Sequence, residues 1–265
     1  MPPLSPRPAF LCGLLAICSL LILAACGRAA PLLDASSIDA GTLHVDGDAA
    51  EWVGHLRSVD GAPLALGVAE DDEALYISIL TTDADAVRHT LLTGLVIWVD
   101  VDGGQKKNYG IHFPLGAWGG GRASDPNDRR LRDASDADPA GWLQAMLGRL
   151  ALLQEEVRTV HDRDSLPGLE VDGRLVAGTL TLELKVPLQG AAYALDASQT
   201  SIWGIGLETP EIDREAVRAQ LQARRGPRSG GGVRRGGGRG QGVRGGAGRP
   251  SPPEPVEAWV RVARR

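Results

Sequence analysis

The chain has 265 residues, three cysteines and a formal net charge of -5. Residues 222–250 hold eight arginines and no acidic residue, so the rest of the chain is strongly acidic. Two of the cysteines, Cys12 and Cys18, fall in a predicted signal peptide, which leaves Cys26 alone in a mature chain and excludes a disulfide within it. We therefore expect one domain held together by its hydrophobic core.

Residues 1–25 are typical of a cleaved signal peptide. Arg7 is the only charged residue before an uncharged apolar run at residues 9–25. Small residues and a cysteine close the run, which favours processing over a membrane-spanning anchor. Residues 23–26 (LAAC) resemble a bacterial lipobox. The resemblance implies cleavage before Cys26 and acylation of Cys26; an ordinary signal peptide with an incidental cysteine is the alternative.

Lipidation of Cys26 predicts that the protein is attached to the cell envelope by acyl chains, because two or three chains hold a protein firmly on a bilayer. Residues 26–40 then serve as a lipidated tether. Gly27 follows the cysteine where inner-membrane lipoproteins carry a retaining aspartate, so the outer membrane is favoured.

Short strands separated by Asp and Gly turns dominate the rest of the sequence. Residues 94–101 (GLVIWVDV) form a nearly continuous apolar run, and residues 109–115 are expected to pair with it as a hairpin. The many strands and few helices favour a mainly β fold, a β-sandwich. Further strands are predicted at residues 75–80, 175–186, 201–207 and 257–262.

Two segments break this pattern. Residues 139–160 place apolar side chains three and four apart, which predicts one long amphipathic helix. Residues 210–225 begin with acids and end with arginines, as a helix dipole favours. The segment that follows, residues 226–250, consists mostly of glycine and arginine and is predicted to be a disordered loop.

Five motifs follow one another along the chain: residues 45–52 (VDGDAAEW), 71–80, 95–103, 181–188 (TLELKVPL) and 203–205 (WGI). Together and in this order they resemble the family 9 carbohydrate-binding modules and their DOMON-type relatives. The resemblance implies a jelly-roll-type β-sandwich over residues 41–265, with a helical insertion at about 119–170 and a second insertion, a helix and then the Arg/Gly-rich loop, at about 211–255. It also implies carbohydrate binding, since these modules clamp a sugar between two tryptophans.

Tryptophans are the candidate ligand-binding residues. Trp118 lies between glycines, where its ring could stand open and stack on a sugar; a loop anchor packed on the core is the alternative. Trp98 and Trp203 are weaker candidates, because both fall in predicted strand interiors where core packing is expected.

Acidic residues suggest a calcium site. Asp100 and Asp102 at the predicted hairpin turn supply hard oxygen ligands, and Asp83 and Asp85 could add to them if the strands are neighbours. The alternative is ordinary Asp-Gly turn chemistry.

Other chemistry finds little support in the sequence. Haem is disfavoured, because Met146 and five scattered histidines show no paired ligand spacing. No nucleophile stands beside an evident base, so the protein is not expected to be an enzyme. The Arg/Gly-rich loop lacks aromatic residues for base stacking, which favours anionic envelope partners over nucleic acid.

The sequence thus predicts a non-catalytic envelope lipoprotein that binds a glycan or a related surface ligand. A haem-binding electron-transfer module and an envelope scaffold that acts through the Arg/Gly-rich loop remain the alternatives.

Overall fold

A computed structural model describes residues 30, 32–35, 38–119, 139–195, 201–211 and 255–264. The predicted signal peptide, Cys26, most of the predicted helix at 210–225 and the Arg/Gly-rich loop lie outside these residues. The fold below is that of the unit from Leu32 onward.

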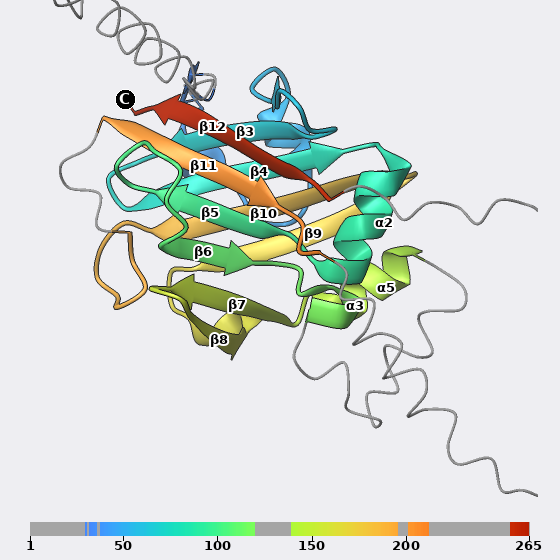
Figure 1. Cartoon of the computed structure of the whole chain (residues 1–265). Helices are drawn as coiled ribbons and strands as arrows, with labels where there is room; N and C mark the ends of the chain where they lie inside the picture. Colours follow the sequence, from blue (N-terminus) through green and yellow to red (C-terminus); the bar gives the residue numbers. More distant parts are fainter. Residues whose placement is uncertain are drawn as a thin grey trace, which may run out of the picture. The chain divides into compact units, whose positions relative to one another are not determined.

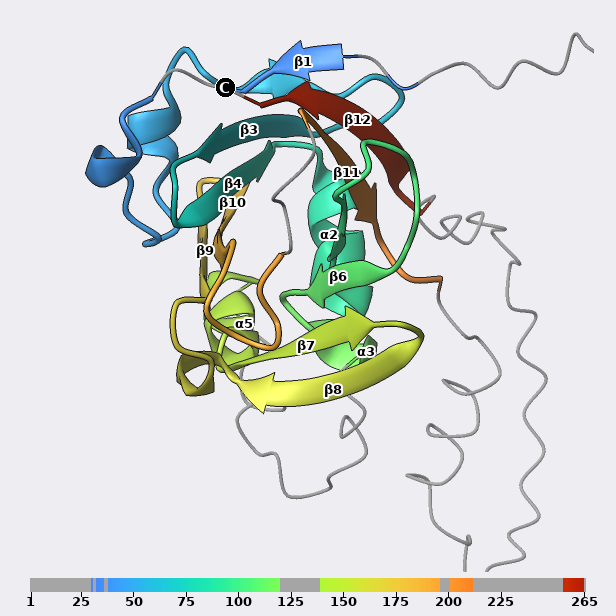
Figure 2. The same ribbon diagram turned by 90° about the vertical axis from the view of Figure 1, so that its left-hand side faces the viewer.

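The described residues form two sheets that pack face to face (Figures 1 and 2). The seven-stranded sheet has the order β1-β12-β11-β5-β6-β7-β8, and the five-stranded sheet has the order β2-β3-β4-β10-β9. All neighbours are antiparallel except β1 and β12. The predicted mainly β sandwich is therefore confirmed. The strands are β1 Leu32–Asp34, β2 Arg57–Ser58, β3 Ala65–Glu70, β4 Ala74–Thr81, β5 Val96–Asp100, β6 Tyr109–His112, β7 Arg149–Gln154, β8 Val157–Asp162, β9 Glu170–Val176, β10 Thr179–Pro187, β11 Ile202–Glu208 and β12 Glu257–Ala263.

The core lies between the sheets and is filled by alternate residues of each strand. On β10 the inward side chains are Leu180, Leu182, Leu184 and Val186, all 2 % exposed or less. The intervening side chains, such as Glu183, point to the outer face of the five-stranded sheet. This alternation sets the two faces of β10 apart. The strand predicted at residues 175–186 is divided by a turn at residues 177–178, so it covers the end of β9 and most of β10.

Three helices gather at one end of the strands (Figure 1): α2 (Ala84–Thr93), α3 (Gly116–Gly119) and α5 (Pro139–Met146). Helix α2 was not predicted from the sequence. Asp83 caps its N-terminus by accepting bonds from the amides of Asp85 and Ala86. Val87 and Leu91 then contribute one helical face to the core between the sheets.

The long helix predicted at residues 139–160 is wrong beyond Met146. Residues 149–162 form the β7–β8 hairpin instead, so this part of the predicted insertion belongs to the seven-stranded sheet. Glu155 and Glu156 both have positive φ, 48° and 69°, as a two-residue type I′ turn requires. The spacing of apolar side chains in the leucine-rich run fits both a helix and a strand. Pairing of β7 with β6 selects the strand.

Residues 38–56 cover the outer face of the five-stranded sheet, where Ala40, Leu43 and Trp52 pack against Ala69, Ala74 and Tyr76. Trp52 ends the short 3-10 helix η3 (Ala49–Trp52) and lies flat on Gly67, where any Cβ would meet its ring. Glu183 Oε2 accepts bonds from the amides of Asp46 at 3.1 Å and Gly47 at 2.8 Å. Two of the family-like motifs, residues 45–52 and 181–188, are therefore joined by this one carboxylate.

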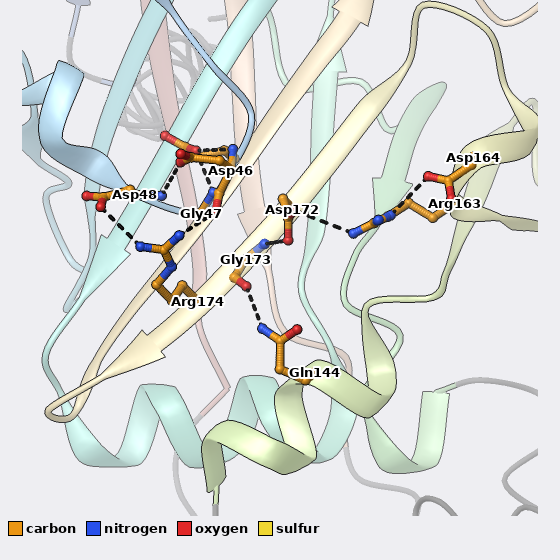
Figure 3. Close-up of polar contacts among 10 residues, drawn as sticks. Asp46, Gly47, Asp48, Gln144, Arg163, Asp164, Asp172, Gly173 and Arg174 are labelled. Atoms are coloured by element: carbon orange, nitrogen blue, oxygen red, sulfur yellow. Dashed lines mark hydrogen bonds and ion pairs between the residues drawn. The ribbon is translucent and has the colours of Figure 1, made fainter.

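The Asp46–Asp48 turn also packs on β9 (Figure 3). Arg174 of β9 donates to Asp48 at 3.1 Å and to the Asp46 carbonyl at 3.3 Å. Gly47 has φ +76°, and a Cβ there would stand 2.8 Å from the backbone of Gly173. Only glycine meets both conditions, which accounts for the Asp-Gly-Asp sequence.

His112 ties strand β6 to the end of helix α2. Its Nε2 lies 2.9 Å from the Thr93 carbonyl oxygen, and the ring is 4 % exposed. Burial lowers the pKa of His112 to about 4, although the bond to Thr93 acts in the opposite direction. The neutral ring donates to Thr93, but burial outweighs this bond, so protonation is disfavoured in the folded state.

We expect His112→Gln to reduce the loss of stability in acid. Between pH 6.5 and 4 the unfolded chain binds a proton at His112 that the folded chain does not, so the stabilisation is complete above pH 6.5 and falls as the pH drops toward 4. The contribution amounts to roughly 3 kcal/mol at most. Urea unfolding at several pH values measures this contribution, with exposed His44→Gln as the control. If the free energy of unfolding changed equally with pH in wild type and His112→Gln, the assignment of the effect to His112 would be refuted.

Candidate functional site

Trp203, a predicted ligand candidate, lies in the core. The ring is fully buried, and its Nε1 donates to Glu70 Oε2 at 2.9 Å. The Arg264 guanidinium lies 4.6 Å from the ring centroid and donates to the same carboxylate oxygen at 2.9 Å. Trp203 therefore holds strand β11 to β3 and the C-terminal strand, and it has no free face for a ligand.

Trp98 points the other way, to the outer face of the seven-stranded sheet. Its neighbours on β5, Ile97 and Val99, enter the core, whereas Trp98 lies over Gly110 of β6. A Cβ on Gly110 would stand 2.6 Å from the Trp98 ring. The ring is 8 % exposed, and its Nε1 donates to Glu208 Oε2 at 2.8 Å.

Trp259 of β12 is a second outer-face tryptophan and was not among the predicted ligand-binding residues. It is half-buried and lies over Gly206 of β11, where a Cβ would be 2.7 Å from the ring. Gly206 pairs with Trp259 on one side and with Trp98 on the other. The cross-strand row Trp259–Gly206–Trp98–Gly110 therefore spans four neighbouring strands.

A signal for Trp259 was present in the sequence. Ala258, Val260 and Val262 alternate with it and enter the core, so Trp259 shares the polar face of β12 with Glu257 and Arg261. A tryptophan on the polar face of an amphipathic strand favours a surface role over core packing.

Charged side chains surround the two tryptophans. Lys107 Nζ lies 2.7 Å from Glu208, 3.3 Å from Glu257 and 6.0 Å from the centroid of the Trp98 ring. The hydrogen bond to Glu208 raises the pKa of Lys107, with a weaker effect from Glu257. The ammonium group thus stays charged and links β11 and β12 above the row of rings.

Asp100, a predicted calcium ligand, organises the loop that carries Lys107. Its Oδ1 accepts from the Asp102 amide at 3.0 Å, and its Oδ2 accepts from the Lys106 amide at 2.9 Å. The loop folds back on β11 so closely that a Cβ on Gly204 would meet the Gly104 carbonyl. A buried carboxylate with two backbone donors is a stable loop anchor without any metal ion.

The other three predicted calcium ligands also have protein partners. Asp102 pairs with Lys106, Asp83 caps helix α2, and Asp85 pairs with Arg88 at 2.7 Å. Across the described ranges, no group of three or more His, Cys, Asp or Glu side chains is placed to hold a metal ion. Calcium at these four residues stays a prediction.

Two further sequence predictions lie outside what the structure describes. Trp118 belongs to α3, but its side chain is not among the described ones. Cys26 precedes the described residues altogether. In the described part of the chain, no helix combines the length and the apolar character that a membrane span needs.

The fold has distant counterparts among solved structures. It is similar to a family 9 carbohydrate-binding module from Caldicellulosiruptor kristjanssonii in complex with glucose, with 13 % sequence identity and a TM-score of 0.32 over 70 % of this chain and 80 % of that one. The corresponding complex with cellotriose has 12 % identity and a TM-score of 0.33 over 70 % of this chain and 78 % of that one. No protein-family model matches the sequence, and no curated protein matches it.

Proposed function

We propose that this protein is a non-catalytic envelope lipoprotein that binds carbohydrate on the outer face of its seven-stranded sheet. The observation that carries the proposal is the row Trp259–Gly206–Trp98–Gly110, in which two indole rings lie on glycines away from the core. Trp259 is the principal stacking surface, and Trp98 supports it from the neighbouring position.

The chemistry of this face suits a sugar. A pyranose has an apolar C–H surface that stacks on an indole ring and a rim of hydroxyl groups that need hydrogen-bond partners. Trp259 supplies the ring. Glu257, on the same face of β12, and Lys107, beside the Trp98 ring, supply an acceptor and a donor, both with exposed side chains.

A structural role alone does not account for Trp259. Core packing on β12 is complete without it, since Ala258, Val260 and Val262 fill the inward positions. A β-branched residue at position 206 would give a more stable strand than glycine does. Glycine instead leaves the backbone bare and flat beneath the ring. A large ring packed over a glycine therefore favours a surface shaped for a ligand.

The proposed anchor places this site at the envelope. Acylation of Cys26 would hold the sandwich near a membrane, because only five residues separate Cys26 from the first strand residue, Leu32. At that location, a glycan-binding face has cell-surface or periplasmic polysaccharide within reach. The outer membrane is the favoured site because Gly27 follows the cysteine.

We expect Trp259→Ala to weaken glycan binding by about 10- to 100-fold, since the variant loses the stacking ring. Glucose, cellotriose and cellohexaose are suitable probes because their equatorial hydroxyls leave both ring faces apolar. Isothermal titration measures the affinities. Trp142→Ala removes a half-buried tryptophan from helix α5 and should leave binding unchanged.

The floor beneath the ring provides a second test. Gly206→Ala places a methyl group 2.7 Å from the original position of Trp259, so the ring must tilt. Binding should weaken although no side chain that touches the sugar has changed. Gly148→Ala, where a Cβ meets nothing within 4 Å, is the matched control. Wild-type affinity in both Gly206→Ala and Trp259→Ala would refute this site.

We expect Cys26→Ser to abolish lipid attachment. In bacteria that express the full chain, labelled palmitate should be incorporated into wild type and not into the variant, because serine offers no thiol for alkylation. The variant should also leave the membrane fraction after cell lysis. Cys12→Ser and Cys18→Ser, within the predicted signal peptide, serve as controls and should remain labelled.

A further inference from the structure

An arginine lies beside the proposed stacking ring on the outer face of β12. Arg261 follows Trp259 by two residues, and the alternate residues Val260 and Val262 enter the core, so Trp259 and Arg261 point to the same face. Residues two apart on a strand are separated by roughly 7 Å. The guanidinium, at the end of a long side chain, can therefore reach the edge of a sugar stacked on Trp259.

The positions next to Arg261 on this face are uncharged. Its cross-strand neighbours are Leu32 of β1 on one side and Gly204 of β11 on the other. Gly204 adds no side chain, and the Gly104 carbonyl of the Asp100 loop lies against its backbone. Along β12 the neighbours on the same face are Trp259 and Ala263. None of these four positions offers the arginine a carboxylate.

Arg261 forms no ion pair and no cation–π contact within the part of the chain that the structure describes. The other cations of β12 and of the Asp100 loop do have acidic partners: Lys106 pairs with Asp102, Lys107 with Glu208 and Glu257, and Arg264 with Glu70. The chain has 33 acidic residues against 28 lysines and arginines, so carboxylates are plentiful. The charge of Arg261 is thus left available for a ligand.

Opposite charges flank the Trp259 ring along its strand. Glu257 lies two residues before the ring and Arg261 two residues after it, all on one face. The Glu257 carboxylate is 3.3 Å from Lys107, which partly neutralises it. A neutral sugar would use only the hydrogen-bonding capacity of these groups. A sugar with a negative charge at one edge would also use the charge of Arg261.

We infer that the glycan is acidic and that Arg261 binds the carboxylate of a hexuronic acid residue stacked on Trp259. This inference rests on the proposed glycan site and specifies the class of its ligand. A hexuronate keeps the apolar ring face of a hexose and carries a carboxylate at the ring edge in place of the C6 hydroxymethyl group. The planar guanidinium can donate two parallel hydrogen bonds to that carboxylate.

Two trisaccharides that differ only at C6 test this inference: cellotriose, and its oxidised form in which every C6 is a carboxylate. Quenching of tryptophan fluorescence in the full chain in detergent measures binding, since the basic segment at residues 226–250 contains no tryptophan. We expect the acidic trisaccharide to bind about 5- to 20-fold more tightly than cellotriose. The preference should shrink as salt is added, because salt screens exposed charges.

Variants separate the charge from the ring. Arg261→Gln should remove the preference and leave the affinity for cellotriose unchanged, because glutamine is polar but uncharged. Arg261→Lys should keep part of the preference, since lysine retains the charge without the planar fork. Trp259→Ala should weaken binding of both trisaccharides. Arg88→Gln removes a charge from helix α2, where Arg88 pairs with Asp85, and should retain the full preference.

Three results would overturn the inference while the glycan site stands: equal affinity of the wild type for both trisaccharides, an equal loss of both in Arg261→Gln, or a preference that persists in Arg261→Gln. The last result would assign the carboxylate to another cation. If neither trisaccharide binds to the wild type, the glycan site itself is wrong and the inference falls with it.

Discussion

The alternation of side chains along β11 is the constraint on which the seven-stranded sheet depends. Trp203, Ile205 and Leu207 enter the core, while Gly204 and Gly206 occupy the intervening outward positions. The bulky inward residues hold the strand against the opposite sheet. The bare outward face lets neighbouring groups approach the backbone: the Asp100 loop closes over Gly204, and the Trp259 ring lies on Gly206.

The two sheets differ in what covers their outer faces. The covered face of the five-stranded sheet has a structural role, whereas the outer face of the seven-stranded sheet carries the proposed binding site. On the five-stranded sheet, residues 38–56 cover the surface, with Trp52 on Gly67 and the Asp46–Gly47 turn on Glu183. On the seven-stranded sheet, a tryptophan over a glycine remains half-buried, with charged groups at its rim. Both outer faces carry an indole ring over a glycine. On the five-stranded sheet this ring is buried, and on the seven-stranded sheet it stays accessible.

Much of the strand pattern was predictable because it is local. The β5–β6 hairpin, β4, β11 and β12 lie where β-branched and apolar runs end at Asp and Gly turns. The β7–β8 hairpin was not predictable, since a leucine-rich run fits both periods until β6 offers it hydrogen bonds. Helix α2 was missed because its two core residues, Val87 and Leu91, give a short and weak apolar stripe.

The sequence by itself determined the mainly β class and the alternating faces of the strands, because each follows from residue type and spacing. Only the tertiary structure decided which tryptophans face outward, since Trp98 and Trp203 have similar strand-interior settings and point to opposite faces. It also decided that Trp259 stands beside Trp98, and Glu183 beside Ser78. Such pairs depend on the register between strands distant in sequence, which no local pattern encodes.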